Sequence, residues 1–286
     1  MPAESSAEPS TDVTVVADVR RRCVAAGEQD PLDEAASLRL KHHGLDGSAL
    51  WVTGGDGFAL AHAAAVDLAV APDARGAGRG SALAAAAFAG DGAVTAWSHG
   101  DHPAAARLAA AHGLERAREL WVMRRPASAP LPEVAVPDGL EVRSYRPEDA
   151  AEVVRVNAAA FAHHPEQGAM DQAELAERMA EDWFDPAGLL VAESTGDGAT
   201  GLLGFHWTKR HSTDLGEVYV VGIDPAAQGR GLGRVLTVAG LAHLAAVGVD
   251  EVLLYVESDN TAARRLYEGL GFTHVAADTH VQYRRS

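Results

Sequence analysis

The sequence predicts an α/β (α+β) protein made of two tandem domains of one fold, each with a mixed β-sheet flanked by helices. Two sequence blocks occur twice in the same order, and strand-like and helix-like segments alternate similarly in both halves. A stretch with four prolines in fourteen residues separates the halves. We therefore expect a disordered tail at residues 1–12, a first domain at 13–125, a linker at 126–139 and a second domain at 140–286.

The repeat is the main evidence for two domains. One match joins residues 66–83, VDLAVAPDARGAGRGSAL, to residues 219–236, YVVGIDPAAQGRGLGRVL, with an offset of 153 residues. A second match joins residues 97–114, WSHGDHPAAARLAAAHGL, to residues 255–272, YVESDNTAARRLYEGLGF, with an offset of 158 residues. Two matched blocks in one order indicate duplication rather than chance.

Periodicity and turn residues predict the elements of the second half. Pro147 favours a helix start, and the Gly-Asp-Gly sequence at 196–198 favours a hairpin turn. The expected strands are 140–146, 188–194, 201–209, 216–223, 251–257 and 272–285, the last as one strand or a pair. The expected helices are 147–162, 171–184, 231–247 and 261–269. The first half repeats this order, with its hairpin around Gly54–Gly57.

The charge and the cysteine content restrict the class of protein. Acidic residues outnumber basic ones by 40 to 24, and the net charge of −16 disfavours nucleic acid as a partner. An anionic cofactor therefore needs a local positive site. Cys23 is the only cysteine, which excludes an intrachain disulfide and fits a reducing compartment. The N-terminus lacks an apolar signal segment and no apolar run approaches about 20 residues, so we expect a soluble cytoplasmic protein without a membrane partner.

The candidate for chemistry is a strand that ends in a glycine-rich turn and leads into a helix. In the second half this turn contains Gly229, Gly231 and Gly233. Glycines at this spacing let backbone N–H groups converge on an anion at a helix start. A Walker A loop would need Gly-Lys-Ser/Thr, and a Rossmann fingerprint would need a different glycine spacing, so both are disfavoured. An ordinary strand–helix turn is the simpler alternative.

Two motifs together resemble those of the GNAT acetyltransferase family. The first is a pyrophosphate loop, Gln/Arg-x-x-Gly-x-Gly/Ala, present as QGRGLG at 228–233 and as RGAGRG at 75–80. The second is N-x-x-A-x-x-L-Y-x-x-L-G-F at 260–272. The resemblance covers both halves. It implies tandem GNAT domains, N-acetyl transfer and acetyl-CoA as the cosubstrate.

The resemblance also implies acetyl-CoA contacts. In the second half they are Val221, Gly222, Ile223, Gln228, Gly229, Arg230, Gly231, Leu232, Gly233, Arg234, Asn260, Thr261, Ala262, Ala263, Arg264 and Arg265. In the first half they are Leu68, Ala69, Val70, Arg75, Gly76, Ala77, Gly78, Arg79, Gly80 and Ser81. The family typically binds the thioester oxygen with a backbone N–H of the strand before the loop, where a β-bulge frees donors. For the first half, the alternative to acetyl-CoA binding is a folded domain that binds no ligand.

Acetyl transfer to an amine needs one group that takes the amine proton and another that protonates the departing thiolate. Glu217, four residues before Val221, is positioned to take the proton, and Tyr267 resembles the family's general acid. A surface carboxylate and a core tyrosine are the simpler alternatives. The two repeat offsets place Ala64 and Ala109 at the corresponding positions of the first half. We therefore expect only the second half to catalyse.

Several strings of the second half resemble those of one group of tandem GNAT enzymes. They are VNAAAFAHHPEQG at 156–168, GFHWTK at 204–209 and GEVYVVGIDP at 216–225. Enzymes of this group acetylate the cysteinyl amine of a cysteine–glucosamine–inositol conjugate, which is therefore the implied acceptor. Carboxylates suit its ammonium and polar side chains suit its hydroxyls. The implied substrate contacts are Glu34, Glu166, Lys209, Glu217 and Tyr255.

Two other function classes stay open from the sequence. One is a GNAT enzyme for another small amine, an aminoglycoside or a protein N-terminus. The other is a non-enzymatic acetyl-CoA-binding module, against which the two proton-transfer residues argue. The 13 histidines lack the ligand spacing of a zinc site, so no metal is expected. We expect a monomer, because two tandem domains satisfy the pairing tendency of single GNAT domains internally.

Overall fold

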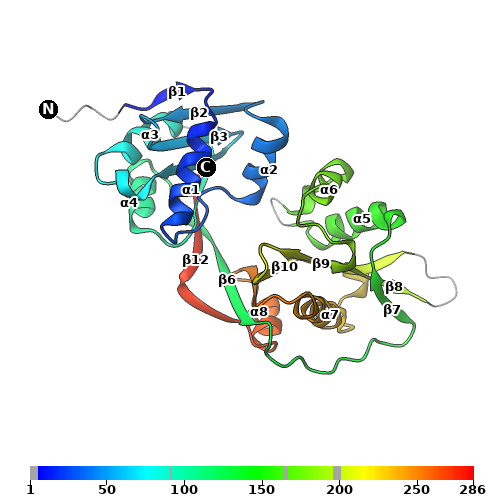
Figure 1. The fold of residues 1–286 in the computed structure, drawn as a ribbon. Coiled ribbons are helices and arrows are strands. Elements are labelled where there is room, and N and C mark those ends of the chain that lie inside the picture. The colour runs from blue at the N-terminus through cyan, green and yellow to red at the C-terminus, as the bar shows by residue number, and fades with distance from the viewer. Residues whose placement is uncertain (1–5, 91, 164–166, 196–200) are drawn as a thin grey trace. The chain divides into compact units, whose positions relative to one another are not determined.

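The computed structural model describes residues 6–90, 92–163, 167–195 and 201–286, which form two compact units (Figure 1). Unit 1 consists of the residues up to Trp121 together with Glu257–Asp259 and Val275–Ser286. Unit 2 consists of Val122–Val256 and Asn260–His274. Each unit combines a β-sheet with helices, as the sequence predicts.

The sheet of unit 1 has the strand order β1-β2-β3-β4-β5-β12. Neighbouring strands are antiparallel except β4 and β5, which are parallel. Helices α1 and α2 lie on one face of the sheet, and α3 and α4 lie on the other (Figure 1). The elements are β1 (Glu8–Ser10), α1 (Thr14–Ala25), α2 (Glu34–His43), β2 (Ser48–Val52), β3 (Gly57–His62), β4 (Ala65–Val70), the 3₁₀ helix η1 (Pro72–Ala74), α3 (Arg79–Ala87), β5 (Val94–Ser98), α4 (Pro103–Ala111), β6 (Glu115–Pro126) and β12 (Thr273–Arg285).

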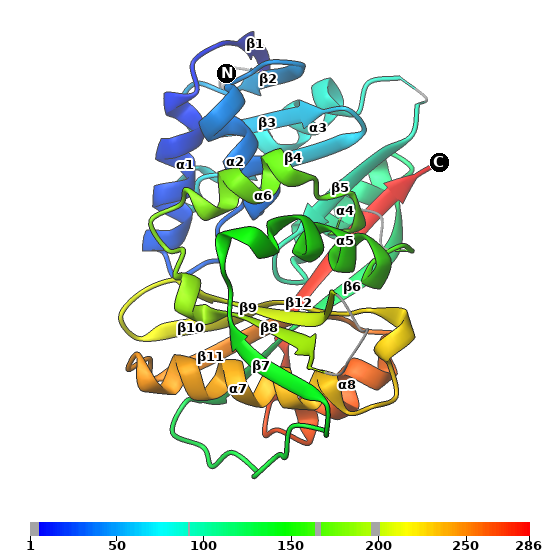
Figure 2. The same cartoon turned by 90° about the vertical axis from the view of Figure 1, so that its right-hand side faces the viewer.

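The sheet of unit 2 has the order β11-β10-β9-β8-β7, with β10 and β11 parallel and the other neighbours antiparallel. Helices α5 and α6 lie on one face, and α7 lies on the other (Figure 2). Strands β6 and β12 have residues in both units. The elements are β7 (Leu140–Ser144), η2 (Pro147–Asp149), α5 (Ala150–Ala160), η3 (Gln167–Ala169), α6 (Gln172–Met179), η4 (Pro186–Gly188), β8 (Leu189–Ser194), β9 (Leu202–Arg210), β10 (Leu215–Ile223), η5 (Pro225–Ala227), α7 (Leu232–Ala246), β11 (Glu251–Glu257) and α8 (Thr261–Glu268).

Short polar side chains fix several helix starts. At the start of α2, the Asp33 carboxylate accepts a hydrogen bond from the backbone N–H of Ala36 at 2.7 Å. Asp171 caps α6 in the same way. Each cap satisfies backbone N–H groups that have no partner within the helix, which stabilises the helix by about 1 kcal/mol.

Each unit buries its own apolar core. In unit 1, Val16 and Val19 of α1 pack with Phe58 of β3 in one cluster of buried residues. In unit 2, the indole of Trp207 on β9 is fully buried, and Trp183 packs against it with ring centroids 5.7 Å apart. These cores hold the sheets that carry the candidate site residues.

The predicted disordered tail is wrong for residues 8–10. Glu8–Ser10 form β1, which pairs with Leu50–Val52 of β2. Composition predicts disorder here because the segment has little apolar surface to bury. An open strand edge, however, offers backbone hydrogen bonds that need no apolar side chain. Residues 1–5 of this tail lie outside the described part of the chain.

Three other expectations concern element limits. The helix predicted at 171–184 ends at Met179, because Trp183 and Phe184 turn away to pack on Trp207. The last segment is one strand, β12. The predicted hairpin turn at 196–198 lies outside the described residues.

The predicted domain limits differ from the compact units at the C-terminus. Val275–Ser286 belongs to unit 1, where β12 pairs with β5. The assignment of this segment to unit 1 depends on which strand β12 pairs with, and a local sequence pattern does not encode that. The limits 13–125 and 140–286 stay a prediction of where each copy begins and ends along the chain. No helix in the described residues is both long and apolar enough to cross a membrane.

Candidate functional site

The glycine-rich loop of unit 2 leads from β10 through η5 to α7. Gly229 and Gly231 have φ angles of 76° and 79°, a left-handed conformation that side chains with a Cβ rarely adopt. Gly231 is also the N-cap of α7. The loop therefore presents backbone N–H groups at a helix N-terminus, which is the arrangement that an anion-binding loop requires.

Unit 1 has the same loop between β4 and α3. Gly76 and Gly78 have φ angles of 78° and 81°, and Gly78 is the N-cap of α3. The duplication that the sequence predicts is therefore also a duplication of backbone geometry.

The third glycine of each loop lies beside the helix that carries the second motif. A Cβ added at Gly233 would lie 3.9 Å from the Leu266 side chain on α8. In unit 1, a Cβ added at Gly80 would lie 3.5 Å from the Leu108 side chain on α4. Leu266 and Leu108 are related by the offset of the second repeated block, as Gly233 and Gly80 are by that of the first. Each unit thus brings its two repeated sequence blocks together at one place.

Strands β10 and β11 pair over only part of their length. Leu215–Val218 pair with Glu251–Leu254, whereas the pairing of β10 with β9 continues to Ile223. The predicted acetyl-CoA contacts at 221–223 therefore lie on the part of β10 for which only pairing with β9 is described. This leaves the other edge of β10 available for hydrogen bonds to a ligand.

A β-bulge interrupts the pairing of β9 and β10. The register shifts between Val218 and Val220, which makes Tyr219 the extra residue. A bulge frees backbone groups, and a freed N–H is the donor expected for a thioester oxygen. In unit 1, Gly57–His62 of β3 pair with β4 residue by residue without a shift. The bulge is thus a difference between the two copies.

Glu217 lies on β10 two residues before the bulge. Its side chain is buried, with 5% of the residue exposed. One carboxylate oxygen, Oε2, is 2.6 Å from Nε2 of His211. The residue opposite it on β9 is Lys209, a second predicted substrate contact. The structure therefore brings Glu217 and Lys209 together and adds His211, which the sequence did not single out.

Aromatic rings hold the Lys209 ammonium. Its Nζ lies 4.7 Å from the ring centroid of Trp183 and 5.2 Å from that of Tyr219. Such cation–π contacts are each favourable by about 0.5–2 kcal/mol, depending on exposure. The lysine charge is thereby positioned on the face of the sheet that also carries Glu217.

Tyr267 lies on α8, and its ring packs edge-on against Phe272 with centroids 5.9 Å apart. Burial raises the pKa of the Tyr267 phenol to about 12. The phenol therefore keeps its proton at neutral pH. A general acid must hold a proton that it can donate, so this environment suits the role predicted for Tyr267.

The start of α8 contains the remaining contacts predicted for unit 2. The Asn260 side chain accepts a hydrogen bond from the backbone N–H of Ala263 at 3.1 Å and so caps the helix. Arg265 is exposed, and Arg264 is half-buried beside Glu268 at 3.9 Å. Asn260 thus has a structural part in forming the helix start at which the two arginines lie.

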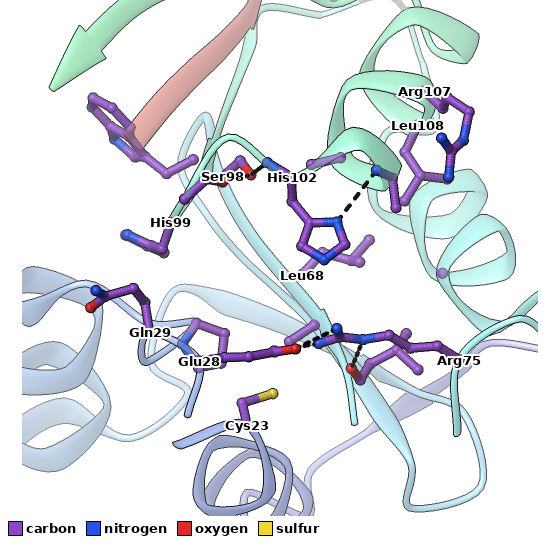
Figure 3. A pocket seen from close by; sticks show the side chains of 18 of the residues that line it. Cys23, Glu28, Gln29, Leu68, Arg75, Ser98, His99, His102, Arg107 and Leu108 are labelled. Carbon is purple, nitrogen blue, oxygen red and sulfur yellow. Dashed lines mark hydrogen bonds and ion pairs between the residues drawn. The ribbon is translucent and has the colours of Figure 1, made fainter. Parts of the chain in front are cut away.

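A cavity of about 850 Å³ lies at the loop of unit 1 (Figure 3). Nine of the ten acetyl-CoA contacts predicted for the first half line it, the exception being Ala77. Cys23 is 2% exposed and lies at the cavity wall. His102, which takes the place of Asn260 in the repeat, lines the cavity and caps α4 through its Nδ1.

One ion pair in this cavity was not expected. The Arg75 guanidinium makes two hydrogen bonds with the Glu28 carboxylate, at 2.6 and 2.7 Å, and also donates to the carbonyl of Val70 (Figure 3). The hydrogen bonds from Arg75 lower the pKa of the Glu28 carboxyl, so Glu28 is ionised at neutral pH. The corresponding loop position in unit 2 is Gln228. The first loop residue of unit 1 is therefore already paired with an anion of the protein.

The other predicted substrate contacts are spread over both units. Glu34 is in the first turn of α2 in unit 1, and Tyr255 is 39% exposed on β11 in unit 2. Glu166 lies outside the described residues. Among the residues that are described, no three His, Cys, Asp or Glu side chains are grouped as metal ligands would be.

The comparisons with known proteins agree with the motifs. A model of the acetyltransferase (GNAT) family matches residues 157–272, which include the loop and the second motif of unit 2. Curated relatives named mycothiol acetyltransferase match most of the chain. The relative from Nocardioides sp. is 60% identical over 96% of this chain and 97% of its own. The relative from Actinosynnema mirum is 49% identical over 93% of this chain and 94% of its own.

Solved structures share the fold of both units. A GCN5-related N-acetyltransferase from Sphaerobacter thermophilus is similar with a TM-score of 0.69 and 23% identity, over 99% of this chain and 96% of its own. A tandem GNAT protein from the clavulanic acid biosynthesis pathway is similar with a TM-score of 0.70 and 20% identity, over 98% of this chain and 97% of its own. The predicted fold class, two tandem GNAT domains, is therefore confirmed.

Proposed function

The chain belongs to the mycothiol acetyltransferases, which are GNAT enzymes, and from this premise we propose which of its residues carry out their reaction. The chain is an acetyl-CoA-dependent N-acetyltransferase. It transfers the acetyl group to the cysteinyl amine of cysteine–glucosamine–inositol, and the products are mycothiol and CoA. The acceptor is thus a small-molecule amine.

The observation that carries the assignment of the chemistry to unit 2 is the buried Glu217 carboxylate beside the bulge of β10. The equivalent position of unit 1 is Ala64, which lies in the turn just before β4, and β3 and β4 pair without a bulge. Unit 1 therefore lacks both a base and the freed donor. Val221, Gly222 and Ile223, which follow the bulge, are the proposed contacts of the acetyl thioester.

The chemistry assigned to Glu217 is the removal of a proton. An amine is protonated at neutral pH and attacks a carbonyl only as the neutral base. The Glu217 carboxylate takes one proton from the substrate ammonium, and the nitrogen then attacks the thioester carbonyl carbon. The backbone N–H at the bulge donates to the oxygen that becomes negatively charged.

The chemistry assigned to Tyr267 completes the transfer. The C–S bond of the tetrahedral intermediate breaks, and the phenol O–H gives its proton to the CoA sulfur. As the amide forms, the nitrogen loses its second proton, and this proton converts the Tyr267 phenolate back to the phenol. The sum is one amide and one CoA thiol formed, and one proton left on Glu217 for release to water.

The test of the proposed function is release of CoA from acetyl-CoA with two acceptors. One is cysteine–glucosamine–inositol, and the other is glucosamine–inositol, which lacks the cysteinyl amine. We expect turnover with the first only. Turnover with peptides or an aminoglycoside in place of the first compound would overturn the substrate assignment and leave an N-acetyltransferase for another amine.

For unit 1 we propose binding of acetyl-CoA without catalysis. The support is the cavity at its loop, together with the paired Arg75 and Glu28. The pyrophosphate of CoA and the Glu28 carboxylate would compete for the same guanidinium, which weakens binding. Glu28→Gln is therefore expected to tighten CoA binding at unit 1 by about twofold to fivefold, since a partly exposed ion pair contributes up to about 1 kcal/mol.

Isothermal titration with CoA measures this effect, because it separates two binding sites per chain. Glu119→Gln is the matched control: Glu119 is 36% exposed like Glu28, pairs with Arg116 at 2.9 Å, and lies outside the cavity. One CoA per chain in the wild type and in Glu28→Gln alike would refute binding at unit 1.

A further inference from the structure

His211 connects the buried Glu217 carboxylate to the surface of unit 2. It directly follows β9, and its Nε2 is 2.6 Å from Oε2 of Glu217. The His211 side chain is 33% exposed, whereas the Glu217 side chain is 7% exposed. One imidazole nitrogen therefore lies beside the carboxylate, and the ring that carries the second nitrogen is partly exposed.

Backbone and side-chain hydrogen bonds fix the turn that carries His211. The backbone N–H of His211 donates to the carbonyl of Leu215 at 2.9 Å. The hydroxyl of Ser212 accepts from the backbone N–H groups of Asp214 and Leu215 at 3.2 and 3.1 Å. These hydrogen bonds order the turn, and the residue that makes the short contact with Glu217 is therefore part of an ordered segment.

Glu217 has to lose a proton in every turnover. In the proposed function it takes this proton from the substrate, and only 7% of its side chain is exposed. Imidazole both accepts and releases protons readily near neutral pH, through two different nitrogens. A histidine between the base and the solvent therefore supplies what the buried carboxylate lacks.

The other charged group that faces Glu217 along the sheet does not suit this task. Lys209 lies opposite Glu217 on β9, and its ammonium is directed over the rings of Trp183 and Tyr219. A lysine ammonium has no acceptor site for a proton. Of the two side chains that neighbour Glu217 here, only the imidazole can receive the proton.

We propose that His211 is a proton-relay residue for Glu217. The imidazole takes at Nε2 the proton that Glu217 has removed from the substrate ammonium, and it releases a proton from Nδ1 to water. Return to the starting tautomer restores the pair, so each turnover moves one proton and no electrons. This inference rests on the proposed function, because it takes Glu217 as the base.

The experiment is a steady-state measurement of acetyl transfer with His211→Ala, using acetyl-CoA and cysteine–glucosamine–inositol, because the proton has to leave Glu217 between one turnover and the next. We expect the transfer rate to fall by about tenfold or more, with the Kd for acetyl-CoA unchanged. Added imidazole should restore the rate. Added pyrazole, a ring of the same shape that is too weak a base at neutral pH, should not. His211→Gln, which keeps a hydrogen-bonding side chain, should stay slow and thereby separates proton relay from positioning.

His243→Gln is the matched control. His243 forms another imidazole–carboxylate pair of unit 2, with Nε2 3.3 Å from Asp185, and we expect this variant to keep the wild-type rate and to ignore imidazole. A wild-type rate for His211→Ala would overturn the relay and leave the proposed function intact. A slow His211→Ala on which imidazole and pyrazole act alike would also overturn it. A wild-type protein that fails to acetylate the cysteinyl amine would instead overturn the proposed function.

Discussion

Replacing Glu217 by glutamine is expected to lower kcat by about 10²- to 10⁴-fold, the contribution usual for a general base. Glutamine has nearly the same shape but cannot take a proton, so the change removes chemistry and leaves the fold of β10 in place. The Kd for acetyl-CoA should stay within about twofold of the wild-type value. Steady-state CoA release with the cysteinyl amine, together with titration of acetyl-CoA, measures both quantities.

Glu251→Gln is the control for this prediction. Glu251 lies on the neighbouring strand β11, where it pairs with Arg124 at 2.7 Å, and it has no proposed part in the reaction. The Glu251→Gln variant should have the same kcat as the wild type. If Glu217→Gln turned over as fast as Glu251→Gln, the base would have to be another group, and the pairing of Glu217 with His211 would be structural.

The double variant Glu217→Gln/His211→Ala connects this prediction with the relay. If the two residues act as one path for one proton, removing both should cost little more than removing Glu217 alone. Independent roles would instead multiply the two losses. The comparison uses the same assay and needs no further acceptor.

The loops and their helices could be predicted from the sequence because their signals are local. Glycines at a spacing of two, just before a helix, require a particular backbone, and Gly76 and Gly229 have the same left-handed conformation in both copies. The position of Glu217 four residues before Val221 likewise follows from the strand itself. The loss of its equivalent in unit 1 could be read from the alignment of the repeat alone.

The partners of these residues could not be predicted in the same way. Glu28 and Arg75 are 47 residues apart, and nothing in either local pattern indicates that they form an ion pair. His211 is only six residues from Glu217, but they meet because a turn reverses the chain between β9 and β10. In the sequence this histidine is one of 13 whose spacing does not fit a zinc site. A signal was present: a histidine at a hairpin end that faces a strand carboxylate.

The assignment of β12 to unit 1 has the same kind of cause. Its sequence predicts a strand, but a strand does not specify its neighbour, and β12 pairs with β5 rather than with the last strand of its own half. Similarly, β1 forms because β2 offers an open edge. Both cases show that strand pairing, and for β1 the strand itself, depends on which edges the folded sheet leaves free.

Replacing Tyr267 by phenylalanine is expected to lower kcat on the order of 10²-fold, because the CoA thiolate then leaves without a proton donor. The ring and its contact with Phe272 are kept, so acetyl-CoA binding and stability should change little. Tyr145→Phe, which removes another half-buried phenol of unit 2, is the control and should turn over normally.

The pH profile tests the same residue independently. Since burial raises the pKa of Tyr267 to about 12, the phenol keeps its proton as the pH rises through the range in which an ordinary tyrosine, with a pKa of about 10, begins to lose it. The wild-type kcat should therefore show no loss from Tyr267 ionisation up to about pH 10. A fall in kcat below that pH that disappears in Tyr267→Phe would contradict the buried environment of this phenol. An unchanged kcat in Tyr267→Phe would contradict its role as the acid and would require the thiolate to leave unprotonated, a step that the low basicity of a thiolate relative to an alkoxide makes chemically reasonable.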